Sequence, residues 1–165
     1  MNILKKSTTF LSLLISVLMV LSLSACSFNG GQEITDYVNI VSDDIHEAVN
    51  LTRELKKQQE MLDARSIESA EKNLDTLSQL VELYSDLAKI ESPKRYEDLD
   101  AEIKDNSKKA LADMMELKSL ITTAKTTGND ALYKQDQQNI MEDYELAYSA
   151  LVDLGSQVTT RCRND

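Results

Sequence analysis

The sequence predicts an all-α protein: an up-down-up-down four-helix bundle preceded by a helical signal peptide and a short tether. Three observations predict this fold class. Apolar residues recur at alternating spacings of three and four over most of the chain, which places them on one face of a helix. No useful length of chain alternates apolar and polar residues as a half-buried strand does. One Pro and four Gly in 165 residues are too few for the turns of a β-sandwich or barrel.

The first element, residues 1–25, has the layout of an export signal. Lys5 and Lys6 precede a nearly continuous apolar run over 10–21. A helix of this length spans roughly 18 Å, short of the ~30 Å hydrocarbon core of a bilayer. The run therefore favours a signal peptide over a transmembrane anchor.

Directly after the apolar run stands Leu23-Ser24-Ala25-Cys26, which resembles the lipobox of bacterial lipoproteins. The resemblance implies that the thiol of Cys26 receives diacylglycerol and that cleavage falls between Ala25 and Cys26. Each buried methylene contributes about 0.8 kcal/mol, and two acyl chains give stable anchoring. The alternative is an ordinary secretory signal with a coincidental cysteine.

Lipidation at Cys26 bears on the second cysteine as well. Because it would consume one of the two thiols, we expect no disulfide within the chain. The role of Cys162 then stays open between a reduced thiol, an intermolecular bridge and an inert residue near the C-terminus.

The second element is the lipidated cysteine with a flexible tether, residues 26–32. The six residues after Cys26 reach at most roughly 20 Å when extended. We therefore expect the bundle, residues 33–165, to lie close to the bilayer. Its predicted helices are about 33–63, 66–91, 95–126 and 130–161.

Each predicted helix carries one inward-facing stripe of mainly apolar residues. The first two stripes are Ile34, Val38, Val41, Ile45, Ala48, Thr52, Leu55, Gln59 and Leu62, and then Ile67, Ala70, Leu74, Leu77, Val81, Tyr84 and Ala88. The last two are Tyr96, Leu99, Ile103, Ser107, Ala110, Met114, Leu117, Ile121 and Ala124, and then Tyr133, Gln137, Ile140, Tyr144, Ala147, Leu151, Leu154 and Val158.

The breaks between helices rest on different signals. Pro93 ends the second helix near Glu91, because it donates no backbone hydrogen bond and disfavours helix at the residue before it. Thr127-Gly128-Asn129-Asp130 is a helix stop followed by a start. The first break has neither Gly nor Pro, so we infer it from the helical spacing of the stripes. If the first stripe continued at the same spacing, it would bury the polar residues Asn73 and Thr76. We therefore predict a turn at 63–66, with Ser66 as N-cap.

Beyond the signal, the chain is similar to small helical-bundle lipoproteins of bacteria. The residues that carry this likeness are Ile90-Glu-Ser-Pro93-Lys-Arg-Tyr96 and Thr127-Gly128-Asn129-Asp130. The resemblance implies a membrane-anchored, extracytoplasmic bundle and transfers no activity.

Three polar residues stand at inward positions near the end of the bundle far from the anchor: Thr52, Gln59 and Gln137. A polar group buried without a partner costs roughly 1–3 kcal/mol. They therefore bond each other and water, or the bundle opens there. We hypothesise a wet notch for a ligand or partner; the alternative is a hydrated bundle end without a role.

Composition and motifs exclude several function classes. A net charge of −10 disfavours nucleic acid, whose binding depends on cationic contacts with phosphates. His46 is the only histidine, which argues against a haem or di-iron bundle, so we expect no cofactor and no metal site. Four cationic residues would lie near the membrane: Lys94, Arg95, Arg161 and Arg163. Acidic residues beside them balance their charge, so we expect no lipid-binding basic patch.

No nucleophile motif or phosphate-binding glycine loop occurs, so we expect a non-enzyme. The expected function is that of a non-catalytic binding or structural lipoprotein on the extracytoplasmic face of the cell membrane, or of the outer membrane if the host has two membranes. Its partners would be membrane lipid, through Cys26, and an envelope protein. The alternative function is a ligand- or cation-binding accessory or sensor lipoprotein.

Overall fold

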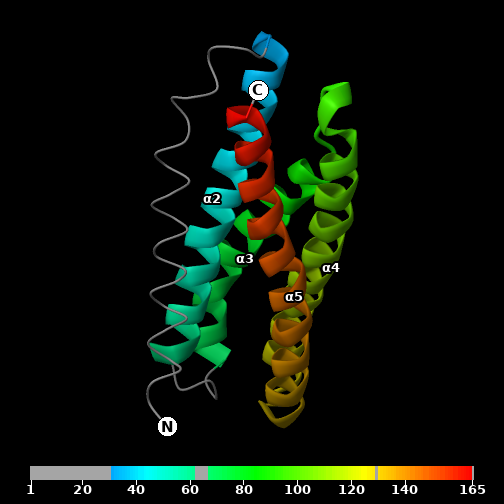
Figure 1. Cartoon of the computed structure of the whole chain (residues 1–165). Coiled ribbons are helices and arrows are strands. Elements are labelled where there is room, and N and C mark those ends of the chain that lie inside the picture. The colour runs from blue at the N-terminus through cyan, green and yellow to red at the C-terminus, as the bar shows by residue number, and fades with distance from the viewer. Residues whose placement is uncertain (1–30, 62–66, 129, 165) are drawn as a thin grey trace, which may run out of the picture.

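The computed structural model describes residues 31–61, 67–128 and 130–164. These residues form α2 (Gln32–Met61), α3 (Ile67–Leu87), α4 (Glu97–Thr127) and α5 (Asp130–Arg163), with a short 3-10 helix, η1 (Lys94–Tyr96), before α4 (Figure 1). No strand occurs in this part of the chain, so the all-α prediction is confirmed. The predicted signal peptide and most of the tether lie outside it.

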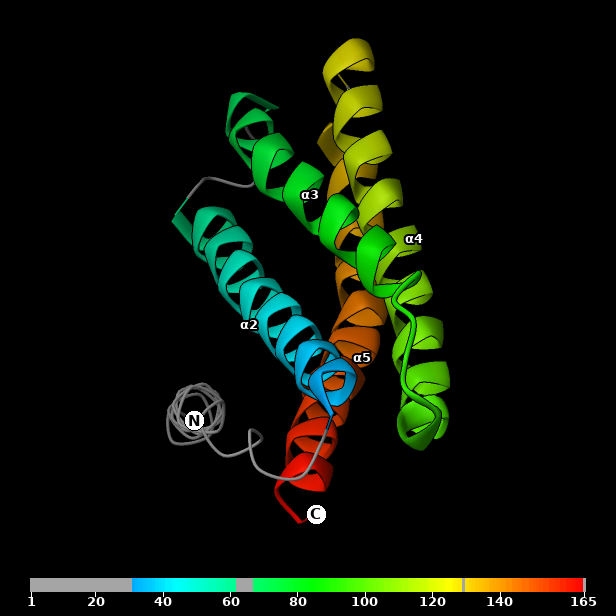
Figure 2. The ribbon, with the colours of Figure 1, turned by 90° about the horizontal axis from the view of Figure 1, so that it is seen from above.

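The four helices pack as a closed ring. Each contacts the next along the chain, and α5 also contacts α2. In both views the start of α2 and the end of α5 lie at one end of the molecule, which we call the terminal end (Figures 1 and 2). Toward the opposite end, the α2–α3 pair leans away from the α4–α5 pair (Figure 2). Within the described ranges, no helix has the length and apolar character needed to span a bilayer.

The core lies along the faces that the sequence predicts for α4 and α5. All nine residues of the predicted α4 stripe, from Tyr96 to Ala124, are buried. The α5 stripe is buried from Ile140 to Val158, whereas Gln137 is half-buried. In α2, the stripe is buried from Val38 to Leu55. The three- and four-residue periodicity therefore identifies the inward face in three of the four helices.

The predicted inward face of α3 is wrong by about one residue. Leu74, Val81 and Ala88 are only half-buried. The residues buried at helical spacing are instead Asn73, Thr76, Leu80, Leu83 and Leu87, flanked by Leu77 and Tyr84. The prediction failed because it kept two polar side chains out of the core, whereas the surrounding apolar positions outweigh them. The turn predicted at 63–66 and its N-cap Ser66 lie outside the described residues.

The connections between helices follow local backbone chemistry where the sequence has a breaker. Gly128 adopts the left-handed conformation, with φ of 65°, and its N–H donates to the carbonyl of Ala124 at 2.8 Å. This bond satisfies one of the carbonyls left unpaired at the end of α4. At the other connection, α3 ends at Leu87, and Pro93 is followed directly by η1.

Candidate functional site

A group of polar and aromatic side chains lies where α2, α3 and α5 meet. We call it the polar seam, and its members are Thr52, Lys56, Tyr84, Tyr144, Glu145 and Tyr148. Thr52 takes an inward position of α2 because three of its four neighbours at spacings of three and four, Ala48, Val49 and Leu55, are buried apolar residues. Tyr144 does the same on α5, and both side chains are buried. The seam is thus set by helical periodicity, although its members are polar.

Three hydroxyl groups form a hydrogen-bonded chain inside the seam. The Thr52 and Tyr144 hydroxyls share a hydrogen bond of 2.5 Å, and the Tyr144 and Tyr84 hydroxyls share one of 2.7 Å. The chain ties α2, α5 and α3 together. Each hydroxyl has a partner, so the seam avoids the 1–3 kcal/mol cost of a buried unsatisfied group.

The tyrosines of the seam are held in the neutral form. Burial raises the pKa of Tyr144 and of Tyr84 well above the usual value. Hydrogen bonds from Thr52 and Tyr84 oppose this rise at Tyr144 without cancelling it. Burial, with the charge of Glu145 as a second cause, raises the pKa of Tyr148 to about 12. At neutral pH these phenols are therefore protonated and act as hydrogen-bonding groups.

The outer edge of the seam is aromatic and charged. The Tyr148 ring stacks on Tyr144 with centroids 5.8 Å apart and planes 25° apart. The Lys56 ammonium lies 5.8 Å from the centre of the Tyr148 ring and forms an ion pair with Glu145 across the α2–α5 boundary. Both charged side chains remain substantially exposed, at 44% and 39%, so the pair contributes at most about 1 kcal/mol.

Two of the three residues of the predicted notch, Thr52 and Gln137, have side chains within the described structure. Thr52 is buried as expected, but its hydroxyl pairs with Tyr144 and not with Gln137. Gln137 is half-buried, and the side chain of Gln59 lies outside the described part. Sequence reasoning missed the tyrosine partners, although Tyr144 stood on the predicted α5 stripe. It also missed Asn73, which is buried and whose side-chain oxygen has no hydrogen-bond partner.

A second cluster closes the terminal end. Arg161 donates from both terminal nitrogens to the Asp98 carboxylate, at 2.5 and 2.8 Å, and to the Arg95 carbonyl at 3.0 Å. Its guanidinium also lies 5.7 Å from the centre of the Tyr96 ring. The hydrogen bond from Arg161 lowers the pKa of Asp98 to about 2. This cluster ties the end of α5 to the start of α4.

The start of α2 joins the same end of the bundle. Tyr37 packs against the Tyr96 ring, with centroids 5.3 Å apart, and its hydroxyl donates to buried Asp100 at 3.5 Å. Lys104 pairs with the same carboxylate at 2.7 Å.

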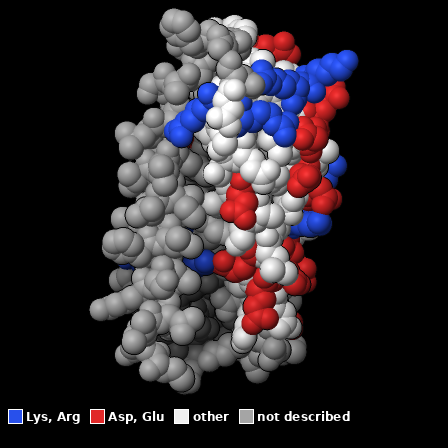
Figure 3. Space-filling view, viewed as in Figure 1, with Lys and Arg blue, Asp and Glu red and all other residues white. Residues whose placement is uncertain are grey.

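Figure 3 shows Lys and Arg side chains gathered at this end of the visible face, with acidic side chains close to them. Arg161 is therefore engaged with protein groups.

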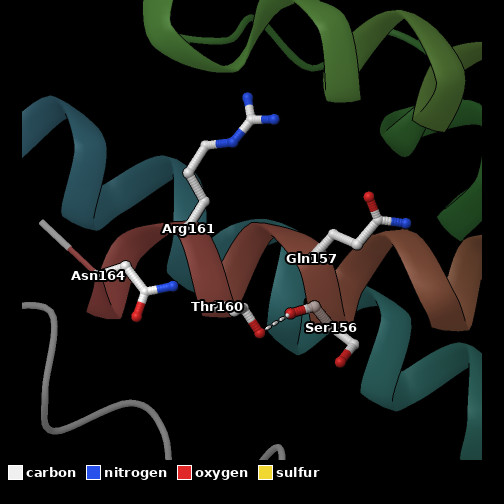
Figure 4. A pocket seen from close by; sticks show the side chains of 5 residues that line it. All are labelled: Ser156, Gln157, Thr160, Arg161 and Asn164. Carbon is white, nitrogen blue, oxygen red and sulfur yellow. Dashed lines mark hydrogen bonds between the residues drawn. The ribbon is translucent and has the colours of Figure 1, made fainter.

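An open hollow of about 430 Å³ lies along the last turns of α5. Its lining residues are Ser156, Gln157, Thr160, Arg161 and Asn164. Figure 4 shows Gln157 and Arg161 extending to the α4 side and the other three to the opposite side. The Thr160 hydroxyl donates to the Ser156 carbonyl at 2.8 Å. The lining groups do not converge on one point, so the hollow lacks the geometry of a ligand site.

Carboxylates gather on the α2–α3 face. Burial, and then the charges of Glu47, Asp86 and Asp43, raise the pKa of Asp44 to about 6. His46, on the same helix, is half-buried. No group of three or more His, Cys, Asp or Glu in the described ranges could hold a metal ion.

Cys162 is half-buried near the end of α5 and is not free in the structure. The prediction of no disulfide within the chain depends on the Cys26 thiol, which lies outside the described residues, so it stays a prediction.

Comparison of the chain with models of protein families, with curated proteins and with solved structures finds no match.

Proposed function

We propose that the protein is a lipoprotein anchored through Cys26 to the extracytoplasmic face of the cell membrane, and that its up-down-up-down bundle is a non-catalytic binding or structural module. The observation that carries the proposal is the order of two lysines, an apolar run and Leu23-Ser24-Ala25-Cys26. In a host with two membranes the anchor would lie in the outer membrane. The partners are membrane lipid, through the anchor, and an envelope protein.

The packing of the described helices supports this orientation and role. α2 begins six residues after Cys26, at the terminal end, where Arg161 and Tyr37 tie three helices together. A short tether entering there would put the terminal end toward the bilayer and the opposite end toward other envelope components. The hydroxyls of the polar seam bond one another and stay neutral, which suits a structural element better than a catalytic one.

The alternative function, a ligand- or cation-binding accessory or sensor lipoprotein, is favoured by one observation. Asn73 is buried and its side-chain oxygen accepts no hydrogen bond from the protein. Replacing the predicted notch residues Gln59 and Gln137 with Leu tests whether the notch binds anything. Stabilisation of the bundle with unchanged phenotype supports the structural role, and loss of phenotype with a stable bundle supports the alternative.

Mass spectrometry of the protein from the membrane fraction tests the anchor. The expected product starts at residue 26 and carries the added mass of a diacylglyceryl group. Cys26→Ser should keep the leader and lose the lipid, with Cys162→Ser as the matched control that leaves the lipid in place. An unacylated product with a disulfide between residues 26 and 162 would overturn the proposal, because one sulfur cannot hold both bonds.

A further inference from the structure

The side of α4 that faces α3 carries a stripe of cationic and apolar residues. The stripe follows spacings of four and three and contains no acidic residue: Lys104, Lys108, Leu111, Met115, Lys118 and Thr122. The Lys118 ammonium donates to the Ser78 hydroxyl of α3 at 2.8 Å, which places this side of α4 beside α3. Leu111 is half-buried, and Met115 is 55% exposed. We call Lys108, Leu111, Met115 and Lys118 the cationic strip.

The outward face of α5 has the opposite charge. Between residues 135 and 160, α5 holds no Lys or Arg and five acidic residues: Asp136, Glu142, Asp143, Glu145 and Asp153. Leu146 is 73% exposed, the most exposed large apolar side chain in the described ranges. Glu142 precedes it by one turn and Asp153 follows it by two, so the three exposed residues share one side of the helix. We call them the acidic face.

The cationic strip and the acidic face match in length and order. The two lysines of the strip are ten residues apart, about 15 Å along the helix, with both apolar side chains between them. The two carboxylates of the acidic face are eleven residues apart, about 16.5 Å, with Leu146 between them. Each surface therefore presents an apolar centre between two charges, and the charges are of opposite sign.

The two surfaces also lie at similar heights along the bundle. Burial, and then the charge of Asp143, raises the pKa of Asp113, so these two carboxylates lie close together across the α4–α5 boundary. Since the end of α5 lies beside the start of α4, the helices run in opposite directions, and Leu146 is level with Leu111 to within about 2 Å. The centres of the two surfaces differ in height by about 7 Å, which the flexible four-carbon stem of lysine can span.

Both lysine and carboxylate groups at these surfaces remain able to pair. The ammonium of Lys118 has three N–H donors, and the bond to Ser78 uses one of them. Gln138 donates to the Glu142 carboxylate at 3.0 Å and leaves its negative charge in place. The charges at the two surfaces are therefore complementary as the structure stands.

We infer that the cationic strip of one copy of this chain binds the acidic face of a second copy, so that copies associate side by side with their terminal ends pointing the same way. Leu146 packs against the apolar side chains of the strip, and the two carboxylates pair with its two lysines. The parallel orientation rests on the proposed lipid anchor, whereas the contact itself does not. Because the two surfaces differ, association continues as an open row or closes into a ring.

The apolar and charged parts of the contact have different roles. Exposed ion pairs contribute little free energy, so burial of Leu146 supplies most of the affinity and the charges select the partner face. Copies anchored in one membrane meet at a high effective concentration, so a contact that is weak in solution is sufficient there.

Cross-linking between labelled copies tests the association on the full-length processed protein in detergent. Unlabelled and 15N-labelled protein are mixed in equal amounts at millimolar concentration and treated with a carbodiimide, which joins lysine to carboxylate. Half of the peptides that join Lys118 to Glu142, or Lys108 to Asp153, should pair a light with a heavy partner. Absence of such mixed pairs would overturn the inference. The readout does not depend on a lipid at Cys26, so it is independent of the test of the anchor.

Charge reversal on one surface at a time distinguishes this contact from other association. One variant carries Lys108→Glu with Lys118→Glu, and the other carries Glu142→Lys with Asp153→Lys. Each alone sets like charges against each other and should associate at least about tenfold more weakly. An equal mixture of the two should associate again, because each variant supplies the surface that the other lacks. With only one variant labelled, every cross-link between copies should then pair a light with a heavy peptide.

Circular dichroism verifies that both charge-reversed variants are folded. Undiminished association of either variant alone would overturn the inference. Failure of the mixture of two folded variants to associate would overturn it as well.

The apolar centre of the contact has a matched control. Leu146→Ala should weaken association roughly tenfold, because most of the apolar surface buried by this side chain is lost. Ile40→Ala removes a side chain of α2 that is 49% exposed and belongs to neither surface, so it should leave association unchanged. A Leu146→Ala protein that associates as tightly as the Ile40→Ala protein would overturn the inference.

Discussion

The two hairpins of the molecule are specified in different ways. The α4–α5 connection contains a local breaker, Gly128, whose φ of 65° and bond to the Ala124 carbonyl end the helix. Between α2 and α3 the sequence contains neither Gly nor Pro, and the residues of that connection lie outside the described ranges. The end of α4 is therefore encoded locally, whereas the described parts of α2 and α3 are held together by contacts along the two helices.

The largest expected effect tests whether the two hairpins fold as one unit. Leu80 of α3 and Leu117 of α4 are both fully buried. Leu80→Ala and Leu117→Ala should each lower the free energy of unfolding by about 3 kcal/mol, because each leaves a cavity in a shared core. Urea titration followed by circular dichroism should show a single transition for both. An early separate transition in Leu80→Ala alone would mean that the α2–α3 hairpin melts independently.

The next effect concerns the bonds that join the hairpins. Tyr144→Phe removes the hydroxyl that bonds both Thr52 and Tyr84 and leaves these two buried groups with fewer partners. The free energy of unfolding should fall by about 1–2 kcal/mol in chemical denaturation. Tyr148→Phe, at the edge of the same seam, is the control and should change it by less than about 0.5 kcal/mol. Equal losses would show that the buried chain does not link the hairpins.

A smaller effect measures the local breaker itself. Gly128→Ala should destabilise the protein by about 1 kcal/mol, because a side chain disfavours the left-handed backbone. No atom lies within 4 Å of the added carbon, so the loss reports the backbone alone. Gly31→Ala, at a glycine without positive φ and equally open, is the control. Thermal unfolding measures the stability of both variants. A Gly128→Ala protein as stable as the unmodified protein would show that Gly128 does not specify the α4–α5 connection locally.

The smallest effect concerns Asp44 of α2, whose pKa is raised by burial and then by the charges of nearby carboxylates. The pKa of Asp44 is raised from 3.8 to about 6, so the folded state binds the proton more tightly than the unfolded state. The resulting stabilisation is complete below about pH 4 and is lost as the pH rises through 6. Asp44→Asn should therefore stabilise the bundle at pH 7 by less than about 1 kcal/mol, because solvent screens this half-buried group.

The pH profile of unfolding measures this effect. The gain from Asp44→Asn should vanish near pH 4, and Asp75→Asn, at an exposed position of α3, is the control. A gain that persists at pH 4 would exclude the burial of a charged Asp44 carboxylate and its repulsion by neighbouring carboxylates as the cause.

How far the sequence predicts the fold depends on the element. In α4 the periodicity identifies every buried position of the stripe, including Ser107, because eight neighbours on that face are apolar or aromatic. In α3 two overlapping stripes compete, and the more polar one, through Asn73 and Thr76, is buried. A rule that keeps polar residues outside cannot choose correctly there, since the choice depends on what α2 and α4 present.

The candidate site is less accessible to sequence reasoning than the fold. Thr52 could be placed inward, but its bond to Tyr144 joins residues 92 positions apart and depends on how two helices are rotated. The bond between Tyr84 and Tyr144 spans 60 positions and involves the helix whose face was predicted wrongly. Long side chains also reach past their own turn, so inward positions near the same end of a bundle do not identify which side chains bond each other.

The neighbouring positions of the start of α2 and the end of α5 have a practical consequence (Figure 1). If Cys26 anchors the protein in a bilayer as proposed, a fluorescent reporter or affinity handle fused to the C-terminus would be held against the lipid surface. Steric crowding at the lipid surface would weaken binding of the affinity handle to a resin and could disturb the ion pair between Arg161 and Asp98. A handle inserted at the opposite end, in the Thr127–Asp130 connection, would stand clear of the bilayer and leave both chain ends untouched.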